Sequence, residues 1–273
     1  MAFTSPNEEI GQQILEISTE DDGGVVASLE TKLLQREHFI SRKNWIFKIP
    51  ARIRELDEKT FIPKAVSIGP LHRKKLEHYE AMEKYKVHYL KQFLDRNPSK
   101  TLTDCVKMLK ELEEEARGCY AVDICLKSDE FVEMMMLDGC FIIECFLMSW
   151  KPAELRYPHS HHPLLNHTYM ITVCEEDLML VENQLPYFVL DALFDFINTS
   201  DSGKLWEISF LGLAFIFYGW NADASNISPE CKPIHLLDIL YREYITRIPK
   251  SKPVSMDRIP RTTQLQGQKT DAF

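Results

Sequence analysis

The run FVEMMMLDGCFIIECFLMSW, from Phe131 to Trp150, constrains the fold of this chain more than any other feature. It is too long for one strand, and Ser128 before it is a suitable residue for the start of a helix. A helix that is apolar on nearly every side must be buried over most of its surface. We therefore expect residues 128–150 to form the central helix of the core, with buried side chains at Phe131, Met135, Phe141, Ile142 and Phe146.

Helical patterns also dominate the rest of the chain. Apolar residues recur at helical spacing, and Asn97-Pro98 is a clear stop signal between two of the segments. Only Trp45–Ile49 and Ala65–Ile68 resemble strands. The predicted helices are Leu29–His38, Lys74–Arg96, a segment capped by Thr101 or Thr103, one from about Cys174, one after Pro186, Leu205–Trp220 and Ile234–Ile245. The predicted fold is mostly α, an irregular multi-helix domain with a few short strands near the N-terminus.

Three regions divide the chain. Residues 1–28 are polar and acidic and predict a flexible arm, residues 29–245 predict the helical domain, and residues 246–273 predict a disordered tail. The tail lacks a helical period and contains prolines at positions 249, 253 and 260. With 273 residues, 45% of them hydrophobic, the chain can bury a core without disulfides or a metal.

Charge is unevenly distributed along the chain. The net charge of −9 argues against general nucleic-acid binding. Residues 42–75 nevertheless contain ten Lys or Arg and three acids, a net charge of +7, which leaves −16 for the remainder. This basic stretch could face an anionic partner or a membrane surface. The simpler interpretation, which we favour, is a solvated face that pairs with acids elsewhere in the fold.

Cysteine usage and hydropathy indicate a cytoplasmic protein for the chain as given. The seven cysteines form no CxxC motif, and the N-terminus lacks the basic and apolar regions of a secretory signal. LWEISFLGLAFIFYGW is too short to span a bilayer, so we expect a buried core segment and no membrane span.

Standard catalytic and cofactor motifs are absent from the sequence, and we expect no cofactor. The segment PHSHHPLLNH has a local density of imidazoles that could bind zinc or copper. Its spacing matches no structural zinc pattern, and we favour a histidine-rich surface loop. The candidate ligands are His159, His161, His162 and His167.

Carboxylates within apolar sequence are the candidate catalytic groups. Asp138 lies in MMMLDGCFII, Glu144 follows it, and Glu182 lies in LMLVENQLPYF. Asp138 and Glu182 in one cleft could act as the acid and base of a glycosidase. We favour a structural role, in which Asp138 pairs with a residue of the basic stretch, and Glu182, Asn183 and Gln184 satisfy backbone donors where Pro186 breaks the helix.

Five strings in order resemble the plant family known as domain of unknown function 247, over about Trp45 to Tyr241. The resemblance implies no catalytic residue, substrate or cofactor, because the family has no established activity; some members are associated with reproductive recognition. The strings are WIFKIPARIRELDEKTFIPKAVSIGPLH, EAMEKYKVHYLKQFL, EFVEMMMLDGCFIIECF, DLMLVENQLPYFVLDALF and PIHLLDILY.

The resemblance also implies a longer protein. Members continue into a second half and end with one hydrophobic helix that anchors them in a membrane. Here IPRTTQLQ begins that continuation and the sequence ends at Phe273, so we expect a C-terminally truncated member. Surfaces meant for the second half would be apolar, and we expect them on Leu205–Trp220 and Ile234–Ile245.

Two functional hypotheses remain open from the sequence, beside a third interpretation in which the chain is a nonfunctional truncated product. The first is a non-enzymatic recognition or regulatory protein that acts through a protein partner. The second is a glycosidase-like hydrolase that uses Asp138 and Glu182. The arrangement of the carboxylates separates them, since an open cleft favours the enzyme and burial against arginine or backbone donors favours the binding protein.

Overall fold

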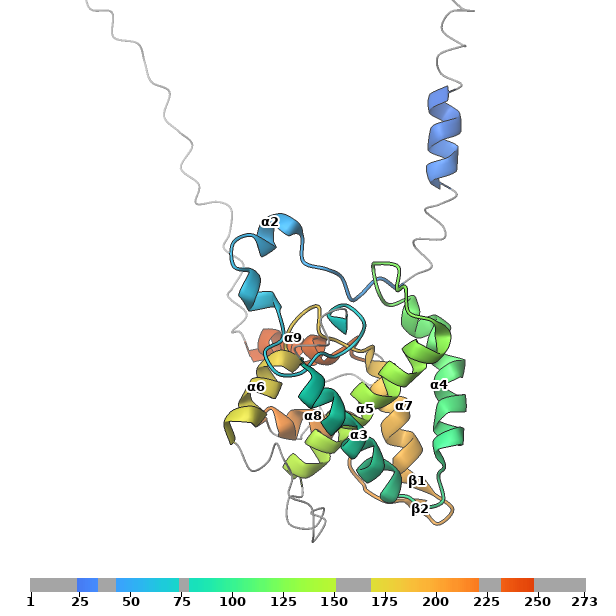
Figure 1. Cartoon of the computed structure of the whole chain (residues 1–273), viewed down its shortest axis with the longest axis vertical. Coiled ribbons are helices and arrows are strands. Elements are labelled where there is room, and N and C mark those ends of the chain that lie inside the picture. Colours follow the sequence, from blue (N-terminus) through green and yellow to red (C-terminus); the bar gives the residue numbers. More distant parts are fainter. Residues whose placement is uncertain (1–23, 34–42, 74–78, 151–167, 221–231, 248–273) are drawn as a thin grey trace, which may run out of the picture.

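A bundle of α-helices around one long central helix forms most of the computed structural model, which describes residues 24–33, 43–73, 79–150, 168–220 and 232–247 (Figure 1). The prediction of a mostly helical fold is confirmed. After a helix at residues 24–33, the elements are α2 (Ala51–Arg54), the 3-10 helix η1 (Glu58–Phe61), α3 (Glu80–Asp95), α4 (Leu102–Arg117), α5 (Ser128–Trp150), α6 (Thr168–Leu178), α7 (Tyr187–Asn198), β1 (Thr199–Ser200), β2 (Gly203–Lys204), α8 (Phe210–Phe217) and α9 (Leu236–Arg247).

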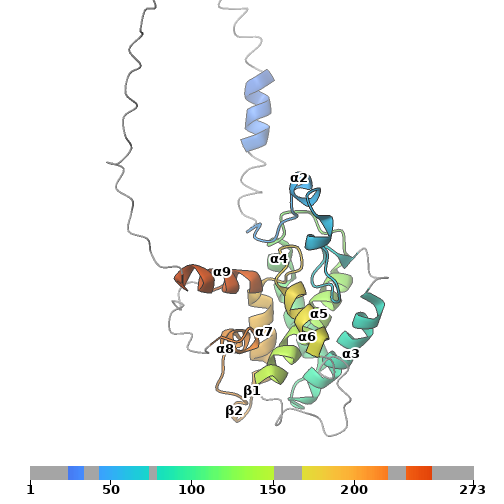
Figure 2. The same ribbon diagram turned by 90° about the vertical axis from the view of Figure 1, so that its left-hand side faces the viewer.

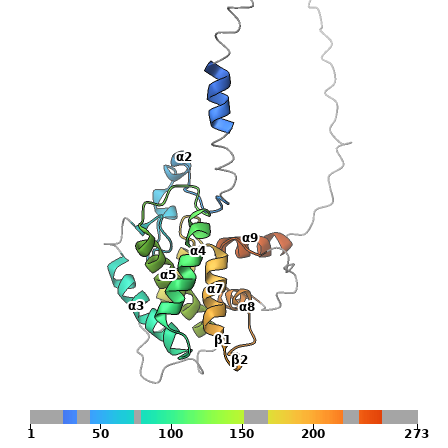
Figure 3. The ribbon, with the colours of Figure 1, turned by 90° about the vertical axis from the view of Figure 1, so that its right-hand side faces the viewer.

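Helix α5 is the centre of the core. It packs against α3, α4, α7 and α8, and Figures 2 and 3 show α3 on one side of it and α7 with α8 on the opposite side. At Gly139 the contact with α7 is so close that a Cβ would lie 2.3 Å from Leu193 Cδ1. The apolar residues on all sides of α5 follow from this position. The five side chains predicted to be buried are all fully buried, namely Phe131, Met135, Phe141, Ile142 and Phe146.

Local signals set the ends of two helices as the sequence predicts. Helix α3 ends just before Asn97, whose side-chain amide donates to the carbonyls of Ile197 and Thr199, both at 3.0 Å. Thr101 begins α4 with a capping box, in which its side chain and that of Asp104 each bind the other's backbone N–H. The short helices α2 and η1 have no counterpart in the predictions.

The predicted strands do not form as a sheet. In residues 45–49, only Ile46 forms an isolated parallel bridge, with Tyr120; its N–H donates to Cys119 and its C=O accepts from Ala121, both at 2.9 Å. No strand forms at residues 65–68, where the structure describes every residue, so of the two alternatives, a short strand or an extended segment, the strand is wrong. Residues 45–49 are called the first extended segment below, and residues 64–69 the second extended segment. The described sheet is the hairpin of β1 and β2, in which Thr199 lies opposite Lys204.

Some predicted helix boundaries are also wrong. Helix α6 begins at Thr168 rather than near Cys174, so the acidic residues Glu175, Glu176 and Asp177 lie at its carboxyl end and not at its amino end. Helix α8 covers only residues 210–217 of the predicted 205–220. The first helix begins at residue 24, within the predicted arm, while residues 1–23, 34–42 and 248–273 lie outside the described structure.

The exposure of apolar side chains differs between α8 and α9, the two helices on which apolar surfaces were predicted. Most of α8 is buried, because Phe210, Leu213 and Phe215 face the core. Helix α9 instead leaves the apolar side chains of Tyr241, Tyr244 and Ile245 exposed. Within the described ranges, no helix is both long enough and apolar enough to cross a membrane.

Candidate functional site

The Asp138 side chain connects α5 to Lys86 in α3 and to the backbone at Gly69. Its carboxylate is fully buried; Oδ1 accepts a hydrogen bond from Lys86 Nζ at 2.6 Å, and Oδ2 accepts one from the Gly69 N–H at 2.8 Å. Burial raises the pKa of the Asp138 carboxyl, and the Lys86 ammonium partly offsets that effect. Lys86 is fully buried too, and it also donates to Glu83 Oε1 and the Ser67 carbonyl, both at 2.6 Å.

The partner of Asp138 differs from the one expected. Lys86 lies in α3, outside the basic stretch of residues 42–75. The packing of α3 along α5 determines this pair, because it places the two side chains opposite each other in the core. The expectation of a partner from the basic stretch is therefore wrong, although Asp138 does pair with a cation.

Glu182 holds the first extended segment. Its side chain is only 3% exposed, and Oε1 accepts from the Ile49 N–H at 2.6 Å and forms an ion pair with Arg54. Oε2 lies 3.5 Å from Nε2 of the buried His72. Glu182 thus satisfies a backbone donor, but this donor belongs to Ile49 and not to the helix break at Pro186. Glu182 connects the turn after α6 to residues 49, 54 and 72.

Asp177 and Asn183 hold the second extended segment in place of a neighbouring strand. The Asp177 carboxylate accepts from the N–H groups of residues 64, 65 and 66 at 2.7, 2.7 and 2.9 Å. Asn183 accepts from the Ile68 N–H at 2.6 Å and donates to the Val66 carbonyl at 3.0 Å. Burial raises the pKa of Asp177, and the backbone donors act in the opposite direction. The sequence predictions missed this role because they placed Asp177 in the first turn of a helix.

Gly69 allows the chain to turn tightly at the end of this segment. Its φ is +71°, and a Cβ at this position would lie 2.5 Å from the carbonyl oxygen of Gln184. That carbonyl also accepts a hydrogen bond from the Tyr120 hydroxyl at 3.1 Å. Any side chain at position 69 would therefore be strained both by its backbone conformation and by contact with a fixed backbone atom.

Glu144 is a fourth buried carboxylate, and both of its oxygens have a partner. It is fully buried in α5, and Arg96 donates to its two oxygens at 2.6 and 2.5 Å. Burial raises the pKa of the Glu144 carboxyl, while the guanidinium lowers it. The paired geometry is that of a structural ion pair, typical of arginine with a carboxylate.

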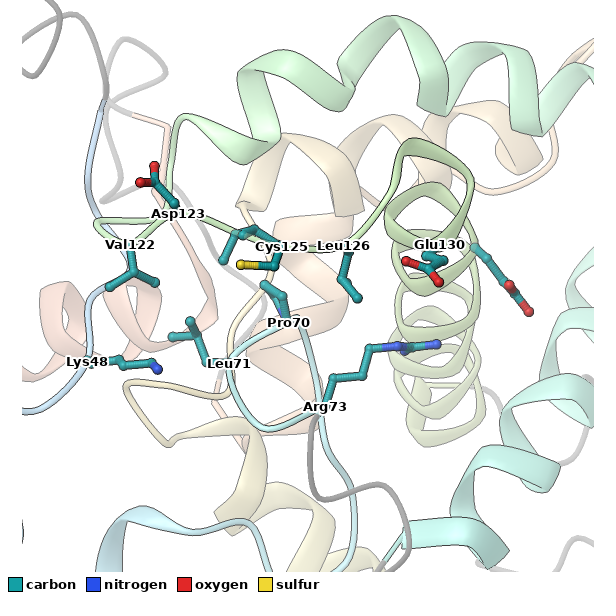
Figure 4. A pocket seen from close by; sticks show the side chains of 11 residues that line it. Lys48, Pro70, Leu71, Arg73, Val122, Asp123, Cys125, Leu126 and Glu130 are labelled. Atoms are coloured by element: carbon teal, nitrogen blue, oxygen red, sulfur yellow. The ribbon is translucent and has the colours of Figure 1, made fainter.

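A surface pocket of about 540 Å³ lies beside these contacts. Its lining comes from three segments, and Figure 4 shows Cys125, Pro70 and Leu71 between Lys48 at one end and Glu130 at the other. None of the four buried carboxylates, Asp138, Glu144, Asp177 and Glu182, lines it. The lining residues are Lys48 from the first extended segment, Pro70, Leu71 and Arg73 from the turn after Gly69, Val122–Leu126 from the α4–α5 connection, and Glu130 and Glu133 from α5.

Buried carboxylates and the partly buried Arg117 hold the backbone beside this pocket. Lys48 precedes Ile49, which Glu182 binds, and Pro70 follows Gly69, which Asp138 binds. In the α4–α5 connection, the Arg117 guanidinium donates to the carbonyls of residues 124 and 126 at 3.1 and 2.8 Å. Asp138 and Glu182 therefore act on the pocket indirectly, by positioning the backbone that surrounds it.

Some cations of the basic stretch, residues 42–75, pair with acids of the described structure and others do not. Lys43, Arg54 and Lys64 pair with Glu115, Glu182 and Glu176, as the favoured interpretation requires. Lys48 and Arg73 line the pocket instead, and they form no ion pair with any described residue.

No described His, Cys, Asp or Glu residues form a group that could hold a metal ion. The histidine candidates His159, His161, His162 and His167 lie within residues 151–167, outside the described structure. Zinc or copper binding by these histidines therefore stays a prediction.

Comparison with known proteins places these residues within a family. The sequence profile of family DUF247, described as plant protein of unknown function, matches residues 46–270. UPF0481 protein At3g47200 of Arabidopsis thaliana is 30% identical over 220 residues, which cover 78% of this chain and 44% of the relative. UPF0481 protein At3g02645 of the same plant is 28% identical over 213 residues, 74% of this chain and 38% of the relative. The chain thus spans less than half the length of these relatives, and no solved structure gives a significant match.

Proposed function

Because this chain belongs to the DUF247 family of plant proteins, whose function is unknown, we propose a function from its own geometry: it is a non-enzymatic recognition or regulatory protein that binds a protein partner. One observation carries this proposal. The buried carboxylates Asp138 and Glu182 hold the two extended segments that wall a surface pocket, and they do not enter that pocket.

The contacts of the two carboxylates support recognition over glycoside hydrolysis. A glycosidase needs two carboxyl groups, about 5 to 10 Å apart, that reach the substrate from an open cleft. Both oxygens of Asp138 already bind donors in the core, and Glu182 contacts Ile49, Arg54 and His72. A sugar could reach either group only after these contacts break.

The surface offers features that suit a protein partner. The pocket has the volume of a typical ligand site, and its lining combines aliphatic side chains with both signs of charge. Helix α9 adds exposed aromatic side chains at Tyr241 and Tyr244, a residue type that is enriched at protein interfaces.

Affinity capture from plant tissue, followed by reconstitution with purified proteins, tests the proposal. We expect saturable binding of one purified partner by titration calorimetry, and no turnover of a panel of nitrophenyl glycosides. Turnover that disappears in both Asp138→Asn and Glu182→Gln, while the variants keep the wild-type unfolding transition, would contradict it.

A further inference from the structure

We propose that the pocket between Lys48 and Glu130 binds an extended segment of the partner protein that carries an aliphatic side chain next to a lysine or arginine. This inference rests on the proposed function and adds the site and the chemistry of the bound segment. Three features of the pocket carry it: its aliphatic floor, its excess of carboxylates and the backbone of Cys125, which forms no hydrogen bond within the described residues.

The floor of the pocket fits an aliphatic side chain. Pro70 and Leu71 from the turn after Gly69 line the pocket together with Ile124 and Leu126 of the α4–α5 connection, and all four are partly exposed. Filling this space with an aliphatic group would remove apolar surface from water on both partners. Because buried groups already hold these walls, binding would require little reorganisation of the backbone.

The charges of the pocket favour a basic residue beside that aliphatic side chain. The lining contains three carboxylates, at Asp123, Glu130 and Glu133, and two cations, at Lys48 and Arg73, so its net charge is −1. Glu130 and Glu133 are exposed and lie one turn apart on α5, and Figure 4 shows Glu130 at the end of the pocket away from Lys48. The net charge of −9 on the whole chain would also attract a basic segment.

The backbone at Cys125 is available to the main chain of an extended segment. Arg117 occupies the carbonyls of Ile124 and Leu126 on either side, whereas the N–H and C=O of Cys125 form no hydrogen bond within the described residues. Backbone groups of this kind bind extended peptides in strand-addition complexes. The exposed thiol of Cys125 also reports directly on occupancy, because it lies among the lining residues.

Selection from a display library of short random peptides tests the inference. The protein used carries Cys231→Ser, so that this thiol does not contribute to the maleimide labelling described below. The library is selected on the wild-type surface and counter-selected on the double variant Glu130→Lys/Glu133→Lys. We expect the enriched peptides to share Lys or Arg beside Leu, Ile or Val. A synthetic copy should bind the double variant about tenfold or more weakly and should slow maleimide labelling of Cys125.

Glu207→Lys is the matched control, because Glu207 is exposed and lies outside the pocket. It should bind the peptide like the wild type, and all variants should share one unfolding transition. Enrichment without basic residues, equal binding by the double variant, or unchanged Cys125 labelling would overturn the inference. If a whole partner protein binds the wild type and the double variant equally, the proposed function stands and this site is wrong.

Discussion

Asp138, Glu144 and Glu182 are carboxylates in apolar sequence, and each has a different kind of partner. Asp138 binds an ammonium and a backbone N–H, Glu144 binds a paired guanidinium, and Glu182 combines an arginine, a histidine and a backbone N–H. Burial without such partners would cost several kcal/mol for each charge. These contacts give the three residues a structural purpose that requires no substrate.

Replacement of Asp138 by alanine should strongly destabilise the fold. The variant leaves the buried Lys86 ammonium without its fully buried carboxylate partner and the Gly69 N–H without an acceptor. We expect the free energy of unfolding to fall by about 3 to 5 kcal/mol, measured by urea denaturation. Asp129→Ala, at an exposed acid of the same helix, should stay close to the wild type. An unchanged midpoint for Asp138→Ala would show that this carboxylate is not structural.

For Asp138 and Glu182, the sequence predicts that the carboxylates are unusual but does not predict their partners. The apolar neighbours of Asp138 and Glu182 in the sequence are enough to identify both as unusual carboxylates. Their partners are not identifiable in this way, because Lys86 is one of several lysines in its helix and lies 52 residues from Asp138. Which lysine becomes buried depends on how α3 packs on α5, and that is a tertiary property.

At the scale of elements, periodic patterns predict helices better than extended segments. Helix α5 has the bounds expected from its sequence, because its apolar residues and its starting position are local signals. Residues 65–68 resemble a strand, but Asp177 and Asn183 side chains satisfy their backbone instead of a neighbouring strand. The sequence patterns also missed the hairpin of β1 and β2; Asn198 closes it by hydrogen bonds to both backbone groups of Trp206, at 3.0 and 2.7 Å.

Phe141→Ala should weaken the central helix by creating a cavity in the core. Phe141 is fully buried, and its ring meets the Tyr89 ring edge-on with centroids 5.2 Å apart. We expect the free energy of unfolding to fall by about 3 to 5 kcal/mol. Phe47→Ala is the control, because the Phe47 side chain is 48% exposed. A loss below about 1 kcal/mol for Phe141→Ala would contradict the central position of α5.

His235 should make the start of α9 sensitive to pH. Its Nδ1 accepts the Asp238 N–H at 3.1 Å, and burial lowers its pKa below the ordinary value of 6.5. The unfolded state therefore binds more protons just below pH 6.5, and stability should fall as the pH falls through that range. Urea unfolding at several pH values should show a shallower dependence in His235→Asn, which keeps an acceptor but does not titrate.

His88→Asn, at an exposed histidine in α3, provides the comparison for this measurement. Identical slopes for the wild type and His235→Asn would show that the contact at the start of α9 does not depend on the protonation of His235.

At the scale of the whole molecule, polar side chains join parts of the chain that are distant in sequence. The contacts of Glu182 with Ile49, of Asp177 with Lys64 and of Asn183 with Ile68 each span more than 100 residues. They attach the extended segments to the turn after α6, and through Asp138 to the central helix. The walls of the pocket depend on these attachments, so the buried carboxylates and the proposed binding surface are physically connected.

Amide hydrogen exchange of Glu182→Ala tests this connection most directly. If Glu182 holds the first extended segment, the Ile49 amide should exchange at least about tenfold faster than in the wild type, while α4 and α8 keep their protection. Glu176→Ala, which breaks only an exposed ion pair with Lys64, is the matched control and should leave Ile49 unchanged. Unchanged exchange at Ile49 in Glu182→Ala would contradict the claim that buried carboxylates position the pocket walls.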